Sequence, residues 1–125
     1  MNISVVSIPV SDQDRAKKFY LDVLGFTEIN DAVMSPEMRW VHLAPPGGGA
    51  SVTLVTWFDS MPAGSTRGLV LEVDDVDTWH AQLSAQGFTF PDGVHDAPWG
   101  RYISVDDPDG NGIILQRSRR QPAAS

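Results

Sequence analysis

The chain of 125 residues contains no cysteine, which excludes disulfide bonds, thiolate nucleophiles and thiolate metal sites. It also has no run of 18 apolar residues, so no membrane-spanning helix and no membrane partner are expected. The chain does not open with a basic and then apolar segment, so a secretory signal is not expected either. These absences together favour a cytoplasmic protein.

Positive charge is scarce as well. The chain has 9 Lys and Arg residues against 16 Asp and Glu residues, for a formal net charge of −7 at pH 7. A polyanion is a poor partner for such a chain, so no nucleic-acid partner is expected. Acidic balance usually serves solubility, and a cationic ligand is the alternative interpretation. Hydrophobic residues make up 42% of the chain, enough for the core of one domain.

Two stretches of the sequence repeat the same order of signals. Each has a strand-like segment, then an aspartate placed to cap a helix, then a glycine placed to end that helix. The equivalent residues are Val10, Asp12 and Gly25 in the first half, and Val73, Asp74 or Asp75, and Gly87 in the second. A repeat of this kind indicates two similar modules, neither of which buries its sheet face alone.

Three strands are expected after each helix. In the first half they are expected at residues 26–29, 39–43 and 51–57, with a turn over residues 30–37. In the second half they are expected at residues 88–90, 102–105 and 113–115, with a loop over residues 91–98. Each module therefore reads strand, helix, strand, strand, strand.

The last two strands flank Asp107-Pro108-Asp109-Gly110-Asn111-Gly112, which is strong turn chemistry. This hairpin and the repeat resemble the vicinal oxygen chelate superfamily, which includes glyoxalase I, extradiol dioxygenases and bleomycin-resistance proteins. The resemblance covers roughly residues 1–117 and implies an α+β fold in which two βαβββ modules form a curved, partly open mixed sheet. We expect a single domain over residues 1–125, with modules at 1–57 and 67–117, a linker at 58–66 and a tail at 118–125.

The resemblance also implies where a metal would be held. In metal-using members the ligands come from the first and last strands of each module. The corresponding positions here are Val5, Gly68 and Ile114, with the fourth at Thr53, Leu54 or Val55. None of these residues offers an imidazole, carboxylate or thiolate. No metal and no other cofactor is therefore expected.

Aromatic residues are the strongest candidates for binding a ligand. Of the four tryptophans, Trp79 lies on the apolar stripe of the second helix and is expected in the core. Trp57 ends a strand, and Trp99 lies in a turn similar to the one that borders the drug groove of bleomycin-resistance proteins. Aromatic rings stack on flat ligands and hold cations. The candidate ligand-binding residues are Trp40, His42, Trp57, Phe58, Trp99 and Arg101.

Two of these candidates have other interpretations. Arg101 would pair with a carboxylate or phosphate of a ligand, or else stand in solvent or pair with Asp106 or Asp107. His42 shares a strand face with Trp40. If that face is concave, His42 is the candidate general acid or base; if it is convex, His42 packs under a helix. The pattern does not decide which face lines the cleft.

The sequence favours a metal-independent small-molecule binding protein of the glyoxalase/bleomycin-resistance type, which holds an aromatic or cationic ligand in a Trp-lined groove. One alternative is a metal-independent enzyme of this fold, an isomerase, lyase or cyclase, with His42 or a loop carboxylate as acid or base. Another is a glyoxalase- or dioxygenase-like metalloenzyme with relocated ligands. The resemblance also implies a homodimer, with modules paired within one chain or swapped between chains.

Overall fold

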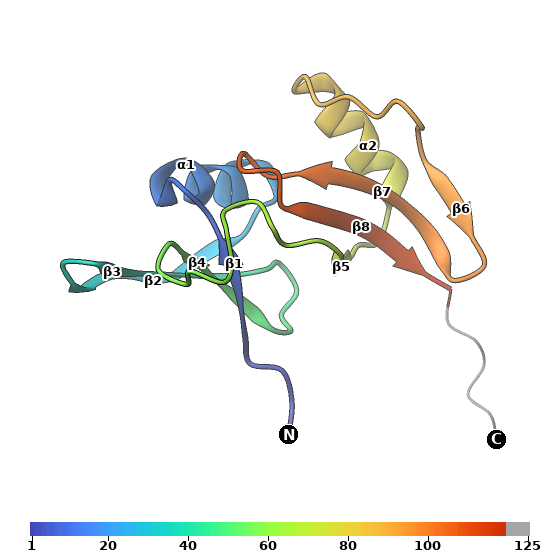
Figure 1. Cartoon of the computed structure of the whole chain (residues 1–125). Coiled ribbons are helices and arrows are strands. Elements are labelled where there is room, and N and C mark those ends of the chain that lie inside the picture. The colour runs from blue at the N-terminus through green and yellow to red at the C-terminus, as the bar shows by residue number, and fades with distance from the viewer. Residues whose placement is uncertain (120–125) are drawn as a thin grey trace. The chain divides into compact units, whose positions relative to one another are not determined.

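The computed structural model describes residues 1–119, so all but the start of the expected tail lies outside the described residues. The elements are β1 (Val5–Pro9), α1 (Gln13–Lys18), η1 (Phe19–Val23), β2 (Thr27–Ser35), β3 (Met38–Ala44), β4 (Ser51–Val55), β5 (Leu69–Glu72), α2 (Val76–Ala85), β6 (His95–Ala97), β7 (Gly100–Asp106) and β8 (Gly112–Ser118) (Figure 1). The expected βαβββ order is present twice. The last strand, β8, continues past residue 115, where it was expected to end.

The chain divides into two compact units. The first contains Met1–Arg67 together with Asp106–Asn111, and the second contains Gly68–Val105 and the chain from Gly112 onward. Each unit has a four-stranded mixed sheet, in the order β1-β4-β3-β2 in the first and β5-β8-β7-β6 in the second. Strands β1 and β5 run parallel to β4 and β8, respectively. The two sheets thus have equivalent topologies, and the expected α+β class is confirmed.

Each helix begins at the expected aspartate. The carboxylate of Asp12 accepts a hydrogen bond from the Arg15 N–H at 3.1 Å, and Asp75, rather than Asp74, does the same for Thr78 at 3.1 Å. The first helix continues into a π-helical turn, η1, which follows α1 directly. None of the helices in residues 1–119 is long and apolar enough to cross a membrane.

The expected turn over residues 30–37 is wrong. Strand β2 runs through Ser35, and only Pro36 and Glu37 form the turn into β3. β2 is an edge strand, and most of its side chains are exposed. An edge strand of this kind does not require the apolar alternation that identifies a half-buried strand in a sequence.

The expected strand at residues 88–90 is also wrong. The Phe88 N–H donates to the Leu83 carbonyl at 3.0 Å, so this backbone completes the end of α2 instead of joining a sheet. The strand that follows α2 is β6, at His95–Ala97, within the stretch expected to be a loop. Three residues are too few to give a strand signal in the sequence.

The turn between β7 and β8 is built into the core of the first unit. Its two buried polar residues, Asp107 and Asn111, are 4% and 1% exposed. The Asp107 carboxylate accepts hydrogen bonds from the Tyr20 hydroxyl (2.9 Å), the Asn111 amide nitrogen Nδ2 (2.8 Å), and the backbone N–H groups of Asp109 and Asn111 (both 2.9 Å). Four donors thus offset the cost of burying this charge.

Asn111 connects the same turn to two other segments of the unit. Its Nδ2 donates to the Pro9 carbonyl of β1 at 2.8 Å, and its Oδ1 accepts from the Thr66 N–H at 3.0 Å. Burial raises the pKa of the Tyr20 hydroxyl far above its ordinary value, and the nearby Asp107 charge adds to that effect. Tyr20 therefore stays protonated and serves as a permanent donor to Asp107.

This network predicts that Asn111→Asp destabilises the protein severely. The change removes the Nδ2 donor from Asp107 and from Pro9, and brings a second buried carboxylate against the first. We expect the free energy of unfolding to fall by about 3 kcal/mol or more. The same change at the exposed Asn2 should alter it by less than about 0.5 kcal/mol. Urea unfolding of both variants tests this, and equal stabilities would contradict it.

Candidate functional site

Strand β3 presents Trp40 and His42 on the sheet face opposite α1. Alternate residues of a strand point to opposite faces. Val41 and Leu43 are fully buried, and Arg39, which shares their face, forms an ion pair with Asp14 of α1 at 2.9 Å. The face of Trp40 and His42 is therefore the one that α1 does not cover, so His42 does not pack under that helix.

Four of the six candidate residues come together in the first unit, and we call them the aromatic cluster: Trp40, His42, Trp57 and Phe58. The Trp40 and Trp57 rings stack with centroids 6.4 Å apart and an interplanar angle of 30°. Trp57 also contacts Phe58 at 5.9 Å, and the His42 ring lies edge-on to Trp40 at 6.0 Å. Phe58 is 45% exposed, and the other three are half-buried.

Hydroxyl groups lie beside these rings on the same sheet face. His42 pairs with Thr53 of β4 in the strand register, and the next residue of β4 on that face is Ser51. His42 Nε2 lies 2.5 Å from Ser51 Oγ, and Ser51 Oγ donates to the Ser4 carbonyl at 3.2 Å. Thr53 Oγ1 lies 3.3 Å from Ser7 Oγ. The face thus combines flat rings with a small set of ordered polar groups.

Trp99 and Arg101 belong to the second unit. The Trp99 side chain is 59% exposed. Its ring stacks on Tyr102 at 6.4 Å, and Tyr102 stacks on His95 at 4.9 Å. Tyr102 and His95 were not among the candidates. The sequence carried a signal for Tyr102, because Arg-Tyr-Ile-Ser-Val at residues 101–105 repeats Arg-Trp-Val-His-Leu at residues 39–43.

Arg101 is held by two carboxylates, and neither is one of the partners considered from sequence. Its guanidinium donates to both oxygens of Asp77 (2.7 and 3.2 Å) and to Asp96 (2.6 Å). The bonds to Asp77, with the charges of both aspartates, raise the pKa of Arg101. These ion pairs are partly exposed, so they contribute little to the free energy of unfolding.

Arg39 occupies the equivalent place in the first unit and has equivalent partners. It forms two hydrogen bonds to Asp31, at 2.8 and 2.9 Å, and an ion pair with Asp14. Asp14 and Asp77 each stand two residues after the aspartate that caps their helix. Both arginines therefore tie a helix to the sheet of their own unit. This shared arrangement indicates a structural role for Arg101.

The strand register resolves which residue of β4 matches Ile114. Ile114 pairs with Val70, and Thr53 pairs with Ser7. Ser7 and Val70 stand at the same place in the two repeats, three residues before Val10 and Val73. The four positions at which the resemblance places metal ligands are therefore Val5, Thr53, Gly68 and Ile114. Within residues 1–119, no group of three or more His, Cys, Asp or Glu side chains is arranged to hold a metal ion.

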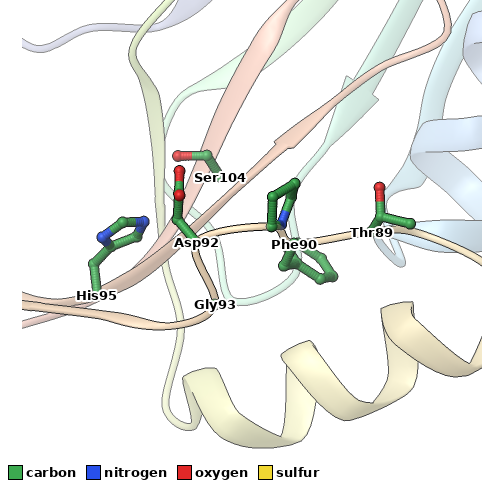
Figure 2. Close-up of a pocket in the computed structure, with 7 residues that line it drawn as sticks. Thr89, Phe90, Asp92, Gly93, His95 and Ser104 are labelled. Atoms are coloured by element: carbon green, nitrogen blue, oxygen red, sulfur yellow. The ribbon is translucent and has the colours of Figure 1, made fainter.

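A separate cavity of about 180 Å³ lies in the second unit (Figure 2). Its polar lining comes from Thr89, Asp92, His95 and Ser104, and its apolar lining includes Phe90. No candidate residue lines it. Sites for drug-sized ligands are usually about 300–1,000 Å³, so this cavity is too small to be the principal site.

Comparison with known proteins identifies relatives over nearly the whole chain. The family model for the Glyoxalase/Bleomycin resistance protein/Dioxygenase superfamily matches residues 2–115. The uncharacterized protein YetH of Bacillus subtilis (strain 168) is 31% identical over 117 residues, which cover 91% of this chain and 96% of YetH.

Two similar solved structures come from Streptomyces sp. CB03234. One is TnmS3, described as an antibiotic binding protein, with 43% identity and a TM-score of 0.88 over 95% of this chain and 97% of that chain. The other is described as a glyoxalase/bleomycin resistance protein, with 44% identity and a TM-score of 0.82 over 92% of this chain and 99% of that chain.

The ion pairs of Arg39 and Lys17 with Asp31 predict a pH-dependent contribution to the free energy of unfolding. Hydrogen bonds from Arg39, and then from Lys17, hold the pKa of Asp31 well below its ordinary value. Asp31 is 18% exposed, whereas Asp14 is 81% exposed. We therefore expect Asp31→Asn to lower the free energy of unfolding at pH 7 by about 1–2 kcal/mol, and Asp14→Asn to lower it by less than about 0.5 kcal/mol.

The pH dependence follows from the sign of the shift. A lowered pKa in the folded state gives stability that is present above the unfolded pKa, about 3.9, and is lost as the pH falls through the folded value. The difference between wild type and Asp31→Asn should be constant above about pH 5 and shrink below about pH 4. Denaturant unfolding from pH 7 down to pH 2 measures it. A difference that persists undiminished at pH 2 would contradict this account.

Proposed function

The chain belongs to the Glyoxalase/Bleomycin resistance protein/Dioxygenase superfamily, and we propose that within it this protein is a metal-independent binding protein for a small molecule. The proposed ligand is flat and aromatic or cationic, and it lies against the aromatic cluster of Trp40, His42, Trp57 and Phe58. Similarity to TnmS3, an antibiotic binding protein, supports a binding role.

The observation that carries the proposal is the stacked pair Trp40–Trp57 on the sheet face that α1 leaves uncovered. Both rings are only half-buried and Phe58 is exposed, so part of this ring surface is open to solvent. Tryptophan faces stack on planar ligands and attract cations through their π-electrons. The net charge of −7 further favours a cation over an anion.

Metal independence is part of the proposal. It is supported by the residues at the four positions that correspond to the superfamily's ligands, of which only Thr53 carries an oxygen donor. That hydroxyl is fully buried and lies within hydrogen-bond distance of Ser7. One such group does not make a site for a divalent ion, which needs several donors.

Trp99 and Arg101, both in the second unit, differ in how available their side chains are to a ligand. Trp99 stays a proposed ligand contact because its exposed ring ends the stack formed with Tyr102 and His95. Arg101 would bind an anionic group of a ligand only if that group displaced Asp77 or Asp96. We therefore assign Arg101 a minor part in affinity.

A second candidate function is a metal-independent enzyme, and the His42–Ser51 contact is the observation that favours it. A histidine oriented through one ring nitrogen can use the other as an acid or base. Turnover would appear as a change in the mass of a bound compound that survives a chelator and disappears in His42→Ala.

We also propose that the protein is a cytoplasmic homodimer. The edge strand β2 supports self-association, because Ile29, Val33 and Met34 are 52%, 74% and 66% exposed. Long edge strands with exposed apolar residues are usually covered by a partner or protected from one. Light scattering after size-exclusion chromatography should give twice the 13.6 kDa chain mass, and Val33→Lys should shift the protein toward monomer. A wild-type monomer would contradict this part of the proposal.

The binding proposal predicts that Trp57 is needed for affinity. Proflavine, a flat aromatic cation, should quench tryptophan fluorescence saturably, with one molecule bound per chain. Trp57→Leu should raise the dissociation constant of proflavine about tenfold, because the substitution removes half of the stacked pair. The matched control is Trp79→Leu on α2, which should leave the constant within about twofold. Proflavine affinity that is unchanged in Trp57→Leu would contradict the proposal.

A further inference from the structure

The polar groups beside the aromatic cluster deepen the proposed function by specifying the ligand, and this inference rests on that function. We infer that His42 is a specificity-determining residue that accepts a hydrogen bond from the ligand through Nδ1. The ligand is then a flat aromatic compound with a donor on its ring, such as a phenolic hydroxyl or an aromatic amine.

The tautomer of His42 follows from the bonds of Ser51. A serine hydroxyl has one hydrogen to donate, and a carbonyl oxygen can only accept. Ser51 Oγ lies 3.2 Å from the Ser4 carbonyl and 2.5 Å from His42 Nε2. Both contacts are hydrogen bonds only if Ser51 donates to Ser4 and accepts from a protonated Nε2. In the other tautomer, Ser51 would donate to Nε2 and leave Ser4 without its hydroxyl bond.

A neutral histidine with hydrogen on Nε2 has a lone pair on Nδ1. In the part of the chain that the structure describes, Nδ1 of His42 makes no hydrogen bond. The ring is half-buried, so a ligand that excludes water from this face would leave the lone pair unsatisfied unless it supplied a donor. An unsatisfied polar group of this kind costs enough to reject a ligand without the donor.

The position of His42 suits a substituent on a stacked ligand. His42 follows Trp40 by two residues on β3, so both rings project from one sheet face, with centroids 6.0 Å apart and an interplanar angle of 62°. A ligand ring placed against Trp40 therefore has its edge close to His42. The neighbouring hydroxyls of Ser7 and Thr53 lie within hydrogen-bond distance of each other, whereas Nδ1 of His42 has no hydrogen-bond partner among the described residues.

The first test reads the tautomer directly, without a ligand. Long-range ¹H–¹⁵N spectra distinguish a protonated ring nitrogen from an unprotonated one, and they should be recorded at a pH where the imidazole is neutral. We expect Nε2 of His42 to be protonated and Nδ1 unprotonated in the wild type. In Ser51→Ala the signals should move toward the average of a tautomer mixture. Protonated Nδ1 in the wild type would overturn the inference.

The second test compares a matched pair of compounds by titration calorimetry. 2-Naphthol carries the donor, and 2-methoxynaphthalene has the same ring system with the donor blocked by a methyl group. The wild type should bind 2-naphthol about tenfold more tightly, the factor given by one hydrogen bond of about 1.4 kcal/mol. In His42→Phe the ratio of the two dissociation constants should fall to about one. His80→Phe on α2 is the matched control and should keep the wild-type ratio.

The outcomes separate this inference from the function on which it rests. If the wild type binds both compounds with equal affinity, the donor has no partner and the inference fails while the binding function stands. A preference for 2-methoxynaphthalene would likewise overturn the inference. If neither compound binds and proflavine does not bind either, the proposed function itself fails.

Discussion

The constraint on which the first unit depends is the burial of one carboxylate, that of Asp107. A charged group in a protein interior is tolerated only when its lone pairs are satisfied. Asp107 meets this condition by collecting donors from the π-helical turn (Tyr20) and from its own turn (Asp109 and Asn111). The same Asn111 amide reaches β1 through Pro9. The turn between β7 and β8 is therefore part of the core of the first unit. There it supports β1 and the neighbouring strand β4.

The two units share a frame and differ in what they present on it. Arg39 and Arg101 stand at the same place and tie helix to sheet in the same way. The residues that follow them have diverged, with Trp and His in the first unit where the second has Tyr and Ser. The ion pairs hold the helix-facing side of β3 and β7, while the divergent residues point to the other side. The residues that differ between the units therefore lie on one face of each sheet, while the ion pairs on the other face stabilise the fold.

The sequence identified most of the fold through patterns that are local. Helix starts were readable because Asp12 and Asp75 act on residues three positions away, and the repeat showed the module order. The strand at residues 30–35 and the short β6 were missed because an exposed edge strand and a three-residue strand carry little apolar pattern. The bonds from Arg101 to Asp77 and from Tyr20 to Asp107 could not be predicted, since they join residues 24 and 87 positions apart in the sequence.

In the candidate site, too, local patterns were predictable from the sequence and contacts between strands were not. Alternation along β3 placed Trp40 and His42 on one face, but only the burial of Val41 and Leu43 and the Arg39–Asp14 pair showed which face it was. The contact of His42 with Ser51 depends on the pairing of β3 with β4, which no local pattern encodes. Tyr102, in contrast, was within reach of the sequence, because the motif around it repeats the motif around Trp40.

The central claim is that a flat ligand is bound by the ring faces of the first unit. The four tryptophans give four indole N–H signals, which makes ¹H–¹⁵N spectra during titration with proflavine the most direct measurement. The account predicts large shifts for Trp40 and Trp57, with intermolecular Overhauser effects to proflavine protons, and an unmoved Trp79. Shifts confined to Trp79, or saturation without any change at Trp40 and Trp57, would contradict it.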